Sequence, residues 1–146
     1  MIENILNAAS IVFSCQGLIA MFLGSLLGTI VGALPGLTAT MTVAILLPIT
    51  FEMSLEVALM AMIGIYCGAL NGGTISAVLI NVPGTPAAMM TGIDGYAMSQ
   101  RGEGGKAIGI ATIGSFYGGI FSNIVLIIAA PILASVALKF GAPEYF

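Results

Sequence analysis

Two stretches of this 146-residue sequence place proline, glycine, hydroxyl and amide residues inside otherwise apolar segments. They run from Pro35 to Thr40 and from Asn71 to Thr85. A helix interrupted within a membrane frees backbone amides and carbonyls that need partners, so such a break lines a cavity or is buried in protein. The N-terminus of the following half-helix offers N–H donors to a carboxylate, and nearby hydroxyls add hydrogen bonds or, with carbonyls, ligate sodium. The expected binding residues are Pro35, Gly36, Thr38, Thr40, Asn71, Gly72, Gly73, Thr74, Asn81, Pro83, Gly84 and Thr85.

Each hydroxyl or amide side chain in this set has a simpler role open to it. Threonine and asparagine at a helix end commonly cap the backbone of their own helix. For any single residue, capping competes with ligand contact, and the sequence leaves both open.

Asp94 is the only aspartate of the chain and lies near an apolar boundary. A lone carboxylate in that position is a candidate site for a coupling proton or cation. Because Gly95 follows it, the pair also fits a tight turn in which the carboxylate caps the backbone.

Several other functions lack the residues they need. The chain has no histidine, and Cys15 and Cys67 lie in apolar surroundings, so we expect two buried small side chains without a metal or disulfide. One aspartate cannot form an aspartyl protease pair, and without histidine a serine protease of the usual kind has no base. No basic patch or phosphate-binding loop is present, so neither a nucleic-acid partner nor ATP hydrolysis is indicated. The chain is not expected to be an enzyme or to bind a cofactor, whereas a channel stays open as an interpretation.

Composition predicts an all-α membrane protein. Hydrophobic residues make up 59% of the chain and charged residues 6%, whereas soluble domains carry about a quarter charged residues. Charges are absent from Asn4–Phe51, Val57–Ile93 and Ala107–Leu138. A spanning helix needs about 20 apolar residues, so multiple transmembrane helices fit these intervals.

Proline and glycine divide the first two intervals into expected elements. A helix is predicted over about Ile11–Ala33, ending at Leu34–Leu37. The next run, Thr38–Phe51, is short for a straight crossing and predicts a half-helix or the arm of a re-entrant hairpin. A second helix is predicted over Val57–Leu70, broken at once by Asn71–Thr74.

Beyond Pro83–Pro86 the sequence predicts a hydrated polar loop through Asp94 to Lys106. Arg101 and Lys106 place this loop on the cytoplasmic side by the positive-inside tendency. The last apolar interval, with Pro131 near its end, predicts one kinked helix or a helix and a half.

Two sequence patterns recur along the chain. Glycines recur every fourth residue at Gly24, Gly28 and Gly32, continuing to Gly36, and again at Gly64, Gly68 and Gly72. This spacing predicts close helix packing in lipid. The pattern P-G-x-x-A-x-M occurs at Pro35–Met41 and at Pro83–Met89. Paired glycine and proline interruptions are typical of a transporter's binding site.

Several motifs together resemble the large membrane subunit of tripartite tricarboxylate transporters. These motifs are Gly32–Thr40, Leu46–Pro48, Ile65–Thr74, Asn81–Pro86, Asp94–Met98 and Ala142–Phe146. The resemblance implies a permease of the bacterial inner membrane that imports di- or tricarboxylates such as citrate. It also implies two partners, a small membrane subunit and a periplasmic solute-binding protein, with an ion gradient of sodium or protons as the driving force.

Large subunits of that family are several times longer than this chain. Residues 1–146 are therefore expected to be the N-terminal part of a transmembrane permease domain, and part of one half of an inverted-repeat transporter. The alternative from another class is a membrane scaffold or assembly subunit whose glycine strips only pack helices. Polar breaks at membrane depth favour the carrier, because a scaffold has no need of them.

Overall fold

The computed structural model describes residues 9–137. Within them every regular element is helical, in the order α2 (Cys15–Gly32), α3 (Ala39–Leu46), the 3-10 helix η1 (Leu47–Thr50), α4 (Leu55–Ile80), α5 (Ala88–Gln100) and α6 (Gly104–Ala137). Helices α2, α4 and α6 are long and apolar enough to cross a membrane. The predicted all-α membrane fold is confirmed, while the motif Ala142–Phe146 lies outside the described residues.

Helix α2 begins later than the sequence indicated. A short helical turn at residues 9–12 precedes it, and the Ser14 hydroxyl then accepts a hydrogen bond of 3.1 Å from Gly17 N. This side-chain cap supplies an acceptor to the first turn. The predicted end is confirmed, because the helix stops at Gly32 and Gly36 takes a left-handed φ of 87°.

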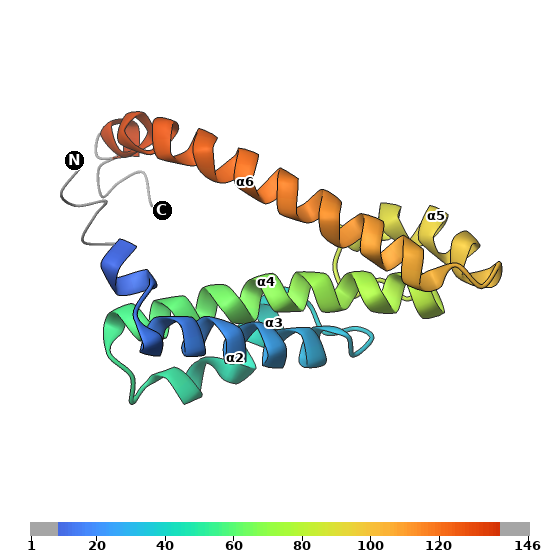
Figure 1. Cartoon of the computed structure of the whole chain (residues 1–146), viewed down its shortest axis with the longest axis horizontal. Coiled ribbons are helices and arrows are strands. Elements are labelled where there is room, and N and C mark those ends of the chain that lie inside the picture. Colours follow the sequence, from blue (N-terminus) through green and yellow to red (C-terminus); the bar gives the residue numbers. More distant parts are fainter. Residues whose placement is uncertain (1–8, 138–146) are drawn as a thin grey trace, which may run out of the picture. The chain divides into compact units, whose positions relative to one another are not determined.

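Helices α2 and α4 lie side by side (Figure 1) and run in the same direction. A Cβ at Gly24 would lie 2.5 Å from Ala61 O, and those at Gly28 and Gly32 would meet the carbonyls of Ile65 and Ala69. Since both series advance along the chain together, the helices are parallel.

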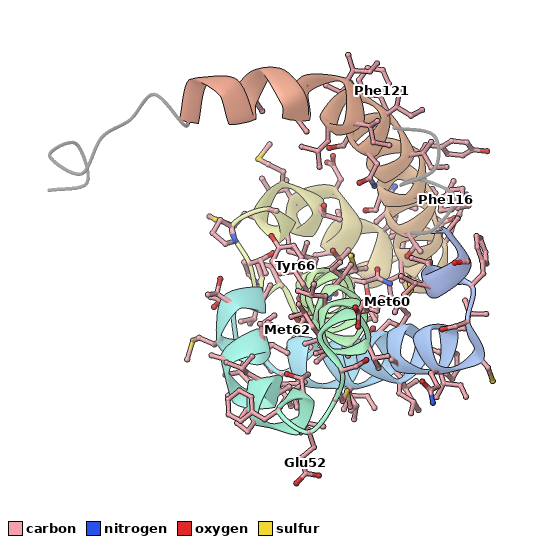
Figure 2. The ribbon with its side chains drawn as sticks, turned by 90° about the vertical axis from the view of Figure 1, so that its left-hand side faces the viewer. Glu52, Met60, Met62, Tyr66, Phe116 and Phe121 are labelled. Carbon is pink, nitrogen blue, oxygen red and sulfur yellow. The ribbon has the colours of Figure 1, made fainter. Side chains whose placement is uncertain are left out.

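The contact is reciprocal. Carbonyl oxygens of α2 lie where Gly64, Gly68 and Gly72 of α4 would carry a Cβ. Glycine therefore places a backbone hydrogen against a backbone oxygen at each step, the arrangement of a weak Cα–H···O contact. Both predicted glycine strips are confirmed as one seam except at Gly36, where a Cβ would meet nothing within 4 Å. Met60 (Figure 2) extends the seam by packing on Gly17.

Parallel neighbours require a segment that returns the chain, and α3 with η1 provides it. The 8 residues of α3 and the 4 of η1 rise by about 1.5 and 2.0 Å each, together roughly 20 Å. This matches the level at which α4 starts. Each seam glycine of α2 faces a carbonyl 37 residues later on α4, and continuing that spacing places Leu55 level with Leu18, about 21 Å back along α2 from Gly32. The predicted short arm is confirmed, and Pro48 converts its end to a 3-10 turn.

The break predicted at Asn71–Thr74 is wrong, because α4 is one helix over 26 residues. Its two adjacent glycines, Gly72 and Gly73, pack against different neighbouring segments. A Cβ at Gly72 would lie 2.6 Å from Ala33 N, and one at Gly73 would lie 3.5 Å from the methyl carbon of Thr85. Close packing on two faces, rather than a turn, explains this pair.

The polar loop predicted before Lys106 is also wrong. Residues 88–100 form α5, and Asp94 and Gly95 lie inside it. Gly95 is required by packing, since a Cβ there would lie 2.7 Å from Val78 Cγ2. A turn joins α5 to α6 instead, with Gly102 at a φ of 82° and Glu103 N bonded to Met98 O at 2.9 Å.

Helix α6 contains 34 residues and continues through Pro131. Figure 2 shows it changing direction beyond Phe121, in agreement with the single kinked helix predicted as one of two alternatives. The chain divides into two units at Gly109 and Ile110, and the first unit holds all the predicted binding residues.

Burial of the cysteines was predicted wrongly, since Cys15 and Cys67 are both exposed. Large apolar side chains on the same helices are also exposed, such as Phe22 at 67% and Ile63 at 56%. In a membrane protein the outer surface meets lipid, so an apolar sequence context does not predict burial.

The packing at the seam predicts that two glycine-to-alanine substitutions change the stability of the protein by different amounts. Gly28→Ala drives a methyl group into the Ile65 carbonyl, so we expect overpacking to destabilise the protein by about 1–3 kcal/mol. Gly92→Ala on α5 places its Cβ 3.6 Å from Ala77 Cβ, an ordinary contact, and should be neutral or slightly stabilising. Thermal unfolding of the purified protein in detergent measures both, and equal midpoints would contradict the seam.

Candidate functional site

The segments that contain Pro35–Gly36 and Pro83–Gly84, called here the two proline–glycine segments, meet in space although about fifty residues separate them in sequence. Gly84 lies where three backbones converge. A Cβ on it would lie 3.1 Å from Gly73 Cα, 3.2 Å from Gly32 O and 3.3 Å from Leu37 O. Only glycine lets these backbones come so close without displacing one of them. Gly84 therefore allows the second segment to pack against the first.

An open groove of about 300 Å³ lies where the segments meet. Its lining consists of Gly36, Thr38, Pro83, Gly84, Thr85, Pro86 and Met89. Both segments therefore contribute, and five of the predicted binding residues come together while Thr40 and Pro35 are not part of the lining. The walls are mostly apolar, and Thr38 and Thr85 are the lining residues whose side chains carry a polar group.

Two helices begin at this groove. Thr38 is the N-cap of α3 and Ala87 is the N-cap of α5. The first amides of a helix have no acceptor within it and carry partial positive charge. Both segments thus place a helix N-terminus near the groove, and at α5 the amides of Ala88 and Met89 already donate to the carbonyls three residues earlier.

Thr38 already has a structural role. Its hydroxyl accepts a hydrogen bond of 3.2 Å from Met41 N, and its carbonyl accepts from Thr42 N at 2.9 Å. Of the two roles that the sequence left open for Thr38, the structure contains the capping role.

Thr85 differs from Thr38 because its hydroxyl caps no helix. Its hydroxyl oxygen is buried and finds no hydrogen-bond partner among the described residues. Its carbonyl accepts from Ala88 N at 3.0 Å, and this bond helps to start α5. The N-cap of α5, Ala87, supplies no side-chain hydrogen bond.

The remaining predicted binding residues lie elsewhere. Thr74 donates its hydroxyl to Leu70 O at 3.2 Å within α4, and Asn71 is half-buried on the same helix. Asn81 ends α4 in a left-handed conformation with a φ of 56°, its N–H bonded to Ala77 O at 3.1 Å. These side chains belong to α4 and its C-cap rather than to the groove lining.

Asp94 is exposed on α5 and is not part of the groove lining. Among the described residues, no cluster of three histidine, cysteine or acidic side chains could hold a metal. The charged pair Glu103 and Lys106, at 3.7 Å, lies exposed at the start of α6.

The tripartite tricarboxylate transporter TctA family matches residues 18–146 of this chain. The chain belongs to this family. It is also 53% identical over 89 residues to an uncharacterized 52.8 kDa protein in the TAR-I ttuC' 3' region of Agrobacterium vitis, a stretch covering 61% of this chain and 18% of that protein. No solved structure matches the chain.

Membership in the TctA family places the chain in a family of tripartite tricarboxylate transporters. The groove then gives the repeated P-G-x-x-A-x-M pattern a structural meaning. In both copies the proline–glycine pair precedes a short helix, and the methionine lies in its first turn at Met41 or Met89.

Sequence reasoning omitted Pro86 and Met89 from the binding residues, although both line the groove. The signal was present, since Met89 occupies the last position of the repeated pattern. Its position in the groove follows from the contact of Gly84 with the first segment, which the sequence alone does not specify.

The cap at Thr38 gives a second prediction in this TctA chain. Thr38→Ala should destabilise the protein by about 1 kcal/mol because the first turn of α3 loses its acceptor, whereas Thr38→Asn should retain most of the stability. Thr40→Ala is the matched control, since Thr40 is exposed in the same turn. Unfolding midpoints report the difference, and equal midpoints for Thr38→Ala and Thr40→Ala would show that the cap is unimportant.

Proposed function

We propose that this chain is the N-terminal part of a permease that imports di- or tricarboxylates such as citrate across the bacterial inner membrane. A small membrane subunit and a periplasmic solute-binding protein are the proposed partners. Family membership supports the class of function. The observation that carries the site is the meeting of two proline–glycine segments, each followed by a helix N-terminus, at one groove.

The groove suits a carboxylate for an electrostatic reason. The sequence contains no lysine or arginine before Arg101, so an anion bound at the groove meets no basic side chain from the preceding segments. Backbone N–H groups and two helix N-termini provide the positive potential instead. Fixed dipoles of this kind bind an anion without holding a full charge in the membrane when the site is empty.

An ion gradient is the proposed energy source. A citrate-like substrate carries two or three negative charges, so co-transport of sodium or protons reduces the charge that crosses the membrane. Asp94 is the proposed ion-coupling residue, being the one aspartate of the chain. If it carries the coupling ion, Asp94→Asn should abolish gradient-driven accumulation and Glu103→Gln should not.

The relative that this chain matches is much longer than the chain, which supports a larger transport unit. The chain spans less than a fifth of the curated relative that it matches, the matched stretch covering 18% of that protein. We propose that residues 1–146 form part of one half of an inverted-repeat transporter, in which the second half completes the site.

The scaffold alternative retains one observation in its favour, the seam between α2 and α4, which needs no ligand to explain it. A scaffold does not account for a groove formed by two helix N-termini. Uptake separates the two proposals.

The proposal predicts gradient-dependent uptake of labelled citrate or a related acid by vesicles. The vesicles contain the complete permease with its small subunit, and the solute-binding protein is added outside. Uptake should require both the binding protein and an imposed sodium or proton gradient. Vesicles lacking the permease are the control, and absence of uptake for every carboxylate tested would favour the scaffold.

A further inference from the structure

Thr85 is the one buried side chain among the described residues whose polar atom has no hydrogen-bond partner. The residue is 7% exposed. Other buried hydroxyls of the described chain are satisfied: Thr42 donates to Thr38 O at 3.1 Å, Thr50 to Leu47 O at 2.8 Å, and Ser76 to Gly73 O at 3.0 Å. An unsatisfied buried hydroxyl is costly and calls for an explanation.

The location of Thr85 supplies that explanation. The residue lines the groove, and its methyl carbon faces Gly73 of α4. Two residues later Ala87 begins α5 without a side-chain cap. Thr85 therefore lies just before a helix N-terminus that has no side-chain acceptor of its own.

We propose that the Thr85 hydroxyl, at the N-terminus of α5, forms a subsite for one carboxylate group of the transported substrate. This inference rests on the proposed function and assigns the direct contact to the second segment. At the first segment, Thr38 uses its hydroxyl to cap α3. The two similar sequence segments thus have different roles, a capped wall on one side and a ligand contact on the other.

The charge of the surroundings selects an anion. The α5 N-terminus carries partial positive charge, which repels a cation and attracts a carboxylate. Its first amides, Ala88 N and Met89 N, already donate to Thr85 O and Pro86 O at 3.0 and 3.2 Å, so the Thr85 hydroxyl is the donor assigned to the carboxylate. Its oxygen is buried in this structure, so contact with a ligand requires movement of the groove edge, where Pro86 and Met89 are exposed.

Thr85→Val tests the subsite, because valine keeps the shape of threonine and removes the hydroxyl. If the hydroxyl were only structural, its removal would leave transport unchanged. As a carboxylate donor it should raise the half-saturation concentration for citrate uptake by about tenfold or more, the usual effect of losing a hydrogen bond to a charged group. The unfolding midpoint should stay unchanged or rise, since the variant loses an unsatisfied polar group.

Two further variants complete the test. Thr85→Ser keeps the hydroxyl and should stay within about threefold of the wild-type half-saturation value. Thr50→Val removes an equally buried hydroxyl at the far end of the return arm, and should lower the unfolding midpoint without changing half-saturation. All variants are measured in the complete permease with its partners, in the same vesicles.

Each outcome decides a separate point. Lack of carboxylate uptake by the wild type would refute the proposed function. Wild-type uptake with an unchanged half-saturation value for Thr85→Val would overturn the subsite alone. A Thr85→Val defect confined to sodium dependence at saturating carboxylate would also overturn it, because the hydroxyl would then ligate the coupling ion.

Discussion

The close backbone contact between α2 and α4 is the constraint on which the rest of the first unit depends. Glycine at every fourth position lets carbonyls of each helix occupy the space that a Cβ would take in the other. In lipid, where water exclusion does not drive helices together, this proximity supplies the packing. Because the two helices are parallel, a short arm must return the chain, and the breaks at both ends of α3 follow from that need.

Close backbone contact at glycine also positions the segments that form the groove. Gly73 receives the segment containing Gly84, and Gly92 and Gly95 bring α5 against the last turns of α4. Helix α4 thus carries α2 on one face and the groove segment with α5 on another. Two proline–glycine segments distant in sequence meet because both are positioned by this one helix.

Sequence reasoning succeeded where one residue type has one local consequence. Proline at position 35 ended a helix, and the glycine spacing on α2 and α4 predicted a packing face. It failed where glycine has two uses. Gly72 and Gly73 resembled a break and Asp94 with Gly95 resembled a turn, yet both pairs lie inside helices whose neighbours require the missing Cβ. Which use applies depends on a partner helix, information that a local pattern does not contain. The asymmetry between Thr38 and Thr85 was hidden for the same reason, since it depends on which hydroxyl finds a backbone partner.

Protection of an introduced cysteine tests most directly whether the groove binds the substrate. With Cys15 and Cys67 replaced by alanine, Met89→Cys places a thiol in the groove lining, and Met90→Cys places one on the next residue of α5, outside that lining. Modification by a small membrane-permeant maleimide is followed in the complete permease with and without citrate or a related acid. The account predicts that a transported carboxylate slows modification at position 89, at concentrations matching those for uptake, and leaves position 90 unaffected. Equal rates at position 89 with and without every transported carboxylate would contradict it.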